Sequence, residues 1–168
     1  MKNIVLIGFM GTGKTAIGQM LAQTLGVKYV STDDVIEEKA GKKISDIFQQ
    51  DGEPSFREME CNVVKELSGK NDIVIDTGGG IVLNPNNIHL LRKNGNIICL
   101  WSSPEVIYKR VKEHTHRPLL SVKDPLQKIK DILEQRRPLY EGADYFVNTD
   151  KMTLEQVVGS IITWISKK

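Results

Sequence analysis

The sequence has little of what marks a secreted or membrane-bound protein. It contains two cysteines, Cys61 and Cys99, without a CxxC pair or a cysteine–histidine cluster. Neither a disulfide framework nor a zinc site is indicated, so both thiols are expected to be small buried side chains in a reducing cytoplasm. No apolar run approaches the ~20 residues of a membrane-spanning helix, and the first residues show no signal-peptide pattern.

The sequence also lacks an excess of charge. Its formal net charge is +2, from 23 basic and 21 acidic residues, so we expect neither nucleic acid nor a membrane as the main partner. No internal repeat, low-complexity stretch or long linker divides it. A length of 168 residues therefore fits one domain, residues 1–168, and no feature demands more than a monomer.

Short apolar runs alternate with segments of helical periodicity along the chain. This alternation predicts an α/β fold, in which a parallel sheet of five strands is covered by helices on both faces. Ligands bind beyond the carboxyl ends of the strands in such sheets, so each strand end is a candidate site. The predicted strands are Asn3–Ile7, Lys28–Val30, Asp72–Ile75, Asn96–Trp101 and Tyr145–Val147. The predicted helices are Lys14–Leu25, Asp34–Ala40, Ile44–Gln50, Pro54–Leu67, Pro85–Lys93, Pro104–Lys112, Pro125–Tyr140 and Leu154–Ser166.

The stretch Gly8–Thr15 follows the first predicted strand and opens the first predicted helix. Its glycine, four residues and Gly-Lys-Thr form the P-loop pattern. Glycines let the backbone curl around an anion, and the N–H groups with the helix N-terminus then bind phosphate. Lys14 can reach the β- and γ-phosphates of a nucleoside triphosphate, and the Thr15 hydroxyl can ligate Mg²⁺. A plain glycine turn before a helix would not require the whole pattern.

Two further strand ends carry acids whose roles the pattern leaves open. Asp33 follows the second predicted strand, where it could accept a hydroxyl proton or cap the next helix. Asp76 ends the third strand and precedes the glycines Gly78–Gly80. The acid resembles the second P-loop motif, which holds Mg²⁺, and the glycines favour a close approach of backbone to a ligand over a flexible turn.

Basic residues occur at three other places. Arg57 and Glu60 lie one helical turn apart and can pair. Arg136 and Arg137 near the end of a later helix suit a carboxylate ligand, although a solvated basic helix end is an alternative. The polar segment 112–124 interrupts the α/β order at the position of a mobile lid, whose Arg117 would bring positive charge onto the phosphates.

Together these motifs resemble those of the shikimate kinase family, in order and spacing over nearly the whole chain. The matching stretches are Gly8–Thr15, Ser31–Asp33 with Ile36-Glu37, Gly52–Glu60, Gly78–Gly80, Arg117–Leu120 and Arg136–Tyr140. The resemblance implies a three-layer P-loop kinase fold, with a substrate-binding helical segment at about 33–61 and a lid at about 112–124. The implied reaction is transfer of the ATP γ-phosphate to the 3-hydroxyl of shikimate, with Mg²⁺, in aromatic amino-acid biosynthesis.

The resemblance also assigns roles to individual residues. Lys14, Asp33 and Arg117 are implied to be catalytic, with Asp33 accepting or orienting the proton of the attacking hydroxyl. Glu60 would hold Arg57. The implied ATP-binding residues are Gly11, Thr12, Gly13, Lys14, Thr15, Ala16, Arg110 and Arg117, and the implied shikimate-binding residues are Asp33, Arg57, Gly79, Gly80 and Arg136.

One position departs from the family pattern. The first acid of the family's Asp-x-Asp motif, which helps to hold the Mg²⁺ water shell, is replaced here by Ser31. Our hypothesis is that Asp76 takes over part of this role beside Thr15. The alternative is that Asp76 caps the turn formed by Gly78–Gly80, the glycine turn.

Other functions fit the sequence less well. Gluconate kinases and nucleoside monophosphate kinases share the P-loop and the lid, but they lack this combination of FRxxE, GGG and RxPLY motifs. A GTPase switch needs Asn-Lys-x-Asp, which neither Asn71-Asp72 nor 148–150 supplies. A relative that only binds nucleotide is disfavoured because Lys14, Asp33 and both clamp arginines are present.

Overall fold

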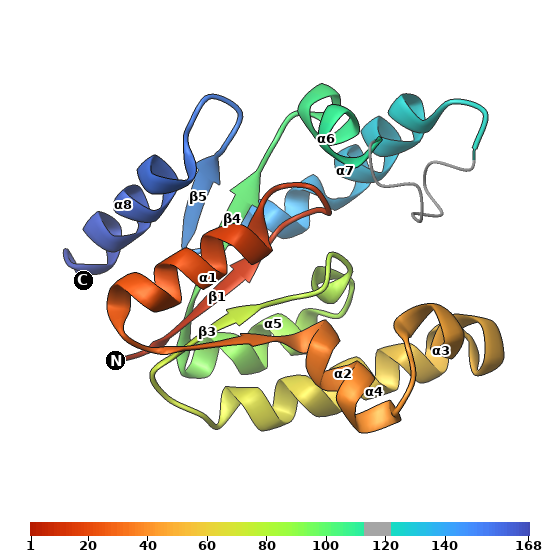
Figure 1. The fold of residues 1–168 in the computed structure, drawn as a ribbon, viewed down its shortest axis with the longest axis horizontal. Coiled ribbons are helices and arrows are strands. Elements are labelled where there is room, and N and C mark those ends of the chain that lie inside the picture. The colour runs from red at the N-terminus through yellow and green to blue at the C-terminus, as the bar shows by residue number, and fades with distance from the viewer. Residues whose placement is uncertain (113–121) are drawn as a thin grey trace.

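Five parallel strands form a single sheet in the order β2-β3-β1-β4-β5 (Figure 1). The structure is a computed structural model that describes residues 1–112 and 122–168. The strands are β1 Asn3–Ile7, β2 Lys28–Ser31, β3 Ile73–Asp76, β4 Gly95–Trp101 and β5 Tyr145–Asn148. The helices are α1 Lys14–Leu25, α2 Thr32–Ala40, α3 Ile44–Gln50, α4 Gly52–Ser68, α5 Pro85–Lys93, α6 Pro104–Val111, α7 Pro125–Glu141 and α8 Leu154–Ile165, with a 3₁₀ turn η1 at Ile81–Leu83.

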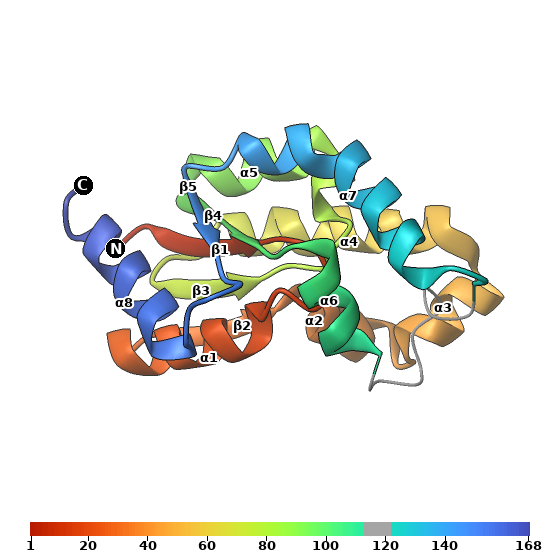
Figure 2. The same ribbon diagram turned by 90° about the horizontal axis from the view of Figure 1, so that it is seen from above.

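Helices cover both faces of this sheet (Figure 2). Helices α4, α5 and α7 lie over one face, and α1 and α8 lie over the other. Each face of the sheet carries its own hydrophobic core, and the side chains of β1 alternate between the two. Val5 and Ile7 pack into the core under α4, α5 and α7, whereas Ile4 and Leu6 pack into the core under α1 and α8. A strand that is buried on both faces reads as a nearly continuous apolar run, which is why the sequence Asn3–Ile7 predicts a fully buried strand.

The predicted α/β architecture is confirmed, and the helix and strand bounds lie within two residues of those predicted. Side-chain caps at Asn84, Asp124 and Thr153 begin α5, α7 and α8. Of the two cysteines, Cys99 is buried as expected. The expectation for Cys61 is wrong, because this residue is only half-buried and its Sγ accepts a hydrogen bond from Asn84 Nδ2 at 3.1 Å.

Two further points concern the parts of the chain outside the core. Among the described residues, no helix combines the length and apolarity needed to cross a membrane. The predicted lid at 112–124 falls mostly on residues 113–121, which lie outside the described residues, and Arg117 is one of them.

Candidate active site

The P-loop connects the end of β1 to the start of α1. Gly8, Gly11 and Gly13 all have positive φ values, of 147°, 75° and 93°. A side chain is strained in this backbone region, and a Cβ atom on Gly8 would also collide with the Leu100 carbonyl oxygen. The loop therefore needs glycine at these positions to curl over the N-terminus of α1, where a phosphate would meet the positive end of the helix dipole.

Side chains of the loop hold its curled shape from within. Lys14 Nζ donates hydrogen bonds to the carbonyl oxygens of Gly8 at 2.8 Å and Phe9 at 3.1 Å. The buried Thr12 hydroxyl donates to the Phe9 carbonyl at 2.8 Å. Lys14 thus lies over the concave side of the loop, where its ammonium group can reach a bound phosphate. Ala16 follows on the exposed side of the first turn of α1.

Asp76 lies at the carboxyl end of β3 and accepts two side-chain hydrogen bonds. Thr15 Oγ1 and Tyr29 Oη both donate to its Oδ2, each at 2.8 Å. Asp76 is only 6% exposed. Burial of Tyr29, followed by the charge of Asp76 and the hydrogen bond to it, raises the pKa of the Tyr29 hydroxyl well above its usual range. The alternative that Asp76 caps the glycine turn is wrong, because the Gly78 N–H donates instead to Thr32 Oγ1 at 3.0 Å.

Ser31 is the register partner of Asp76 across strands β2 and β3. Its Oγ accepts a hydrogen bond from the Asp34 N–H at 3.2 Å and so caps α2. The alternative role of Asp33 as the cap of this helix is therefore wrong, since α2 begins at Thr32, two residues before the predicted start at Asp34. The capping role of Ser31 leaves the Asp33 side chain available for the cavity.

Asp33 lies in the centre of the candidate site. It lines a cavity of about 420 Å³ together with Lys14, Thr15, Asp76 and Gly79. Its Oδ1 is buried without a hydrogen-bond partner among the described residues. Burial, followed by the nearby charges of Glu60 and Asp76, raises its pKa from 3.8 to about 6, while Lys14 opposes the shift. A carboxylate of this kind is still ionised at neutral pH, yet it is a better proton acceptor than an exposed aspartate.

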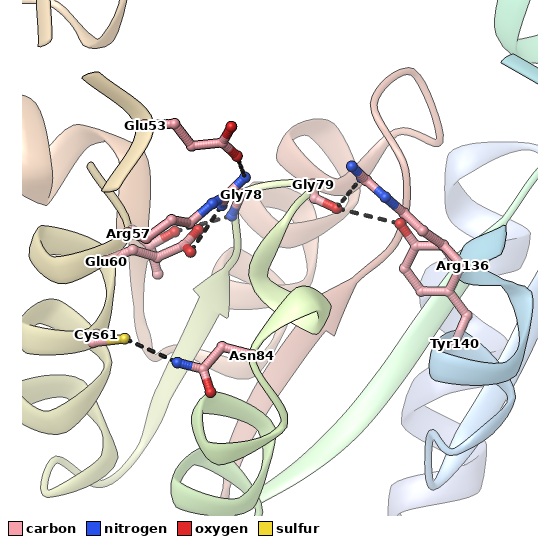
Figure 3. Close-up of polar contacts among 10 residues, drawn as sticks. Glu53, Arg57, Glu60, Cys61, Gly78, Gly79, Asn84, Arg136 and Tyr140 are labelled. Carbon is pink, nitrogen blue, oxygen red and sulfur yellow. Dashed lines mark hydrogen bonds and ion pairs between the residues drawn. The ribbon is translucent and has the colours of Figure 1, made fainter. Parts of the chain in front are cut away.

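Arg57 lies on α4 beside the glycine turn (Figure 3). Its Nη1 pairs with Glu60 Oε2 at 2.9 Å, as the spacing predicts, and its Nη2 pairs with Glu53 Oε1 at 3.3 Å. A Cβ atom on Gly80 would lie 2.5 Å from Arg57 Nη2, so glycine there allows the guanidinium to lie against the backbone. Glu60 is 1% exposed, and burial raises its pKa against the opposing effect of Arg57.

Arg136 approaches the same glycine turn from α7, on the side opposite Arg57 (Figure 3). Its Nη1 donates to the Gly79 carbonyl at 3.1 Å, and the hydroxyl of the buried Tyr140 donates to the same oxygen at 3.2 Å. Two guanidinium groups therefore flank a turn of backbone next to Asp33. Sequence reasoning did not select Tyr140, although it ends the Arg-x-Pro-Leu-Tyr motif.

Arg110 lies apart from these groups, against the outer side of the P-loop. Its Nη1 donates to the Gly11 carbonyl at 3.1 Å and to Ser102 Oγ at 3.0 Å. A second cavity, of about 340 Å³, is lined by Arg110, Thr12, Thr149 and Leu154. This cavity borders the P-loop at Thr12 and Gly13, and apolar side chains such as Ile17 and Leu154 line it together with Arg110.

The donor atoms of the site suit Mg²⁺ better than a transition metal. No group of three or more His, Cys, Asp or Glu side chains within residues 1–112 and 122–168 is arranged to hold a metal ion. The Thr15 hydroxyl and the Asp76 carboxylate provide oxygen ligands near the P-loop. Mg²⁺ commonly takes one or two protein oxygens and completes its shell with water and substrate phosphates. The residues present therefore fit this ion.

Comparisons with known proteins agree with the geometry. The family model described as shikimate kinase matches residues 10–166. A shikimate kinase of Thermodesulfovibrio yellowstonii is 49% identical, over 96% of this chain and 94% of its own, and one of Pelotomaculum thermopropionicum is 48% identical, over 99% and 97%. The structure of shikimate kinase from Acinetobacter baumannii in complex with shikimate superimposes with a TM-score of 0.93 at 36% identity, covering 99% of this chain and 94% of that one. The chain belongs to the shikimate kinase family, whose enzymes use ATP with Mg²⁺ to phosphorylate shikimate.

Proposed function

We propose that this chain transfers the γ-phosphate of ATP to the 3-hydroxyl of shikimate, which gives shikimate 3-phosphate and ADP. The observation that carries the proposal is the convergence of two chemistries on one cavity. Lys14 and Thr15 offer a phosphate site at one end, and Asp33 and Gly79 offer a hydroxyl-binding site beside it. Phosphoryl transfer depends on placing these two groups in line and on neutralising charge, more than on covalent chemistry by the protein.

On the phosphate side, the P-loop residues Gly11, Thr12, Gly13, Lys14, Thr15 and Ala16 would bind the ATP phosphates. Arg110 would lie against the base, and Arg117 of the predicted lid would close over the phosphates. Thr15 and, through water, Asp76 would hold Mg²⁺. This ion, when bound, neutralises charge on the β- and γ-phosphates.

On the acceptor side, Arg57 and Arg136 would bind the shikimate carboxylate from two directions. Paired guanidinium groups recognise a carboxylate through charge-assisted hydrogen bonds. Gly79 and Gly80 would offer backbone N–H groups to the ligand. Asp33 would accept the proton of the attacking hydroxyl, a role for which a pKa of about 6 is well suited.

We propose that the 168 residues act as one domain and as a monomer in the cytoplasm, with shikimate as the small-molecule partner. The near-balance of charge, +2, supports the view that neither nucleic acid nor a membrane is a partner.

The test is a steady-state assay of ADP release with ATP and Mg²⁺ and a panel of acceptors. We expect turnover with shikimate and little above the ATPase background with gluconate or CMP. Turnover with gluconate or CMP but not with shikimate would assign the chain to another small-molecule kinase. No acceptor-dependent turnover, together with normal ADP binding, would indicate a protein that binds nucleotide without catalysis.

A further inference from the structure

We propose that Tyr29 is a positioning residue for the metal side of the site. Its hydroxyl holds the Asp76 carboxylate next to Thr15, and its ring packs against Gly18, which we call the seat of the ring. This inference rests on the proposed role of Thr15 and Asp76 toward Mg²⁺. Tyr29 has no place in the P-loop pattern, and its sequence context, a short strand, predicts only a half-buried aromatic residue.

The sheet register brings the Tyr29 hydroxyl to Asp76. Tyr29 is paired with Val74 across strands β2 and β3, and Ser31 is paired with Asp76. Because side chains alternate along a strand, Tyr29 and Asp76 point to the same face of the sheet and are diagonal neighbours. A diagonal pair is within reach of a long aromatic side chain, and the Tyr29 hydroxyl spans the gap with a hydrogen bond of 2.8 Å.

Helix α1 crosses this face of the sheet and contains the seat for the Tyr29 ring. A Cβ atom on Gly18 would lie 2.9 Å from Tyr29 Cε2 and 3.2 Å from Leu6 Cδ1, so any side chain there would press on the ring. Glycine in the interior of a helix weakens that helix relative to alanine. The space it leaves to Tyr29 is a structural reason for its presence, one turn after Thr15.

The two hydrogen bonds at Asp76 complement each other chemically. Thr15 on α1 and Tyr29 on β2 donate to the same oxygen, Oδ2. The Thr15 hydroxyl has one proton and two lone pairs, so donating its proton to Asp76 leaves the lone pairs available to a cation. The Tyr29 hydroxyl has no such second task. It fixes the carboxylate, as outer groups around metal ligands commonly do.

The experiment measures metal binding rather than activity, with Mn²⁺ as a paramagnetic substitute for Mg²⁺. Electron paramagnetic resonance measures the free Mn²⁺ that remains when the ion is titrated into protein with ADP, which gives the affinity for Mn²⁺. The four proteins compared are wild type, Tyr29→Phe, Asp76→Asn and Tyr145→Phe. Tyr145→Phe is the matched control, since Tyr145 stacks on Trp164 at the far edge of the sheet. We expect Tyr29→Phe to bind Mn²⁺ roughly tenfold more weakly than wild type, while its affinity for metal-free ADP is unchanged. The control Tyr145→Phe should bind Mn²⁺ as wild type does.

Gly18→Ala provides an independent second variant. Its methyl group should displace the Tyr29 ring and weaken Mn²⁺ binding in the same direction. In the double variant, the two effects should combine to less than their product, because both act through one hydroxyl. Fully multiplicative effects would mean that Gly18 and Tyr29 act separately, and they would overturn the proposed seat.

The outcomes separate the failure of this inference from that of the metal assignment. If Asp76→Asn weakens Mn²⁺ binding and Tyr29→Phe does not, the positioning role of Tyr29 is wrong and the metal role of Asp76 stands. If neither variant changes Mn²⁺ binding, the positioning role of Tyr29 and the metal role of Asp76 are both wrong. If Tyr29→Phe weakens metal-free ADP binding equally, Tyr29 supports the fold of the loop and not the metal, which also overturns the inference.

Discussion

The phosphate side and the acceptor side of the cavity are built in opposite ways. The P-loop is one continuous stretch, residues 8–15, and its Lys14 and Thr12 side chains are bonded to carbonyl oxygens within it. The acceptor side is assembled from α2, α4, the glycine turn and α7, which are distant in sequence. It contains buried carboxyl oxygens, Asp33 Oδ1 and Glu60 Oε1, without a hydrogen-bond partner among the described residues.

This difference distinguishes a preformed site from one that needs its ligand. Buried polar atoms are nearly always paired in folded proteins, so an unpaired one indicates a group that water or a ligand completes. Phosphate can enter a loop whose shape is already fixed, at little cost in ordering. On the acceptor side, by contrast, shikimate would supply hydrogen-bond donors that the protein alone does not provide. Substitutions on the two sides should therefore fail in different ways.

Asp33→Ala should cause the largest loss. If Asp33 accepts the proton of the attacking hydroxyl, kcat should fall by ~10²–10⁴, while the KM for ATP changes little. Steady-state kinetics with shikimate varied at saturating ATP and Mg²⁺ measures this effect. Glu38→Ala, which removes an exposed acid of the same helix that does not line the cavity, is the matched control and should retain near-wild-type kcat. A decrease in kcat of less than about tenfold would reduce Asp33 to a binding residue.

Lys14→Met should stop the reaction from the phosphate side alone. Loss of one cation that stabilises the transferring phosphoryl group should lower kcat by roughly 10²–10³. Because Lys14 is bonded within the P-loop, the fold and the acceptor side should be preserved. Calorimetric titration with shikimate should therefore give wild-type affinity. A parallel loss of shikimate affinity would mean that Lys14 acts on the acceptor side beyond its electrostatic effect on Asp33.

Arg136→Ala should affect substrate binding more than chemistry. Removing a charged hydrogen-bond donor should raise the KM for shikimate by roughly tenfold or more, with a much smaller effect on the KM for ATP. Arg137→Ala is the matched control, since Arg137 pairs with Glu141 at 2.7 Å rather than with the glycine turn. Equal increases in both KM values would argue against a carboxylate clamp.

The same contrast explains what the sequence could predict. The P-loop is a local feature, so residue type and spacing were sufficient to predict it. The same reasoning predicts helix caps at Asn84, Ser103, Asp124 and Thr153; three of these side chains cap their helices, whereas the Ser103 side chain makes no cap hydrogen bond. The sequence left open whether Asp33 caps α2, and the structure gives this role to Ser31, because the start of a helix can vary by a residue or two within a run of possible caps.

Features that depend on register could not be predicted at all. The hydrogen bond from Tyr29 to Asp76 requires a particular pairing of β2 with β3, and the seat at Gly18 requires α1 to cross that face of the sheet. Both are properties of tertiary packing, which periodicity along one segment does not contain. The burial that raises the pKa of Asp33 is likewise a product of α2, α4 and the glycine turn coming together.

The smallest expected effect is a shift in a pH profile, and it tests the acceptor side directly. Asp33 must be ionised to accept a proton, so kcat/KM should fall as the pH decreases through about 6. Burial is the main cause of the raised pKa, and the charge of Glu60 is the next. Glu60→Gln should therefore move the acidic limb to lower pH without removing the whole shift, whatever it does to shikimate affinity through Arg57. An unchanged limb would mean that another group controls it.

The contribution of Asp33 to the free energy of unfolding should depend on pH in the opposite sense to kcat/KM, because it decreases as the pH rises. The folded protein holds the Asp33 proton more tightly than the unfolded chain does, since the pKa rises from 3.8 to about 6 on folding. The contribution of Asp33 to the free energy of unfolding is therefore greatest at low pH and is lost as the pH rises through about 6. Asp33→Asn should then be more stable than wild type at pH 7 and lose that advantage below pH 4, as measured by urea unfolding. A buried base that is ionised for catalysis is thus retained at a cost in stability.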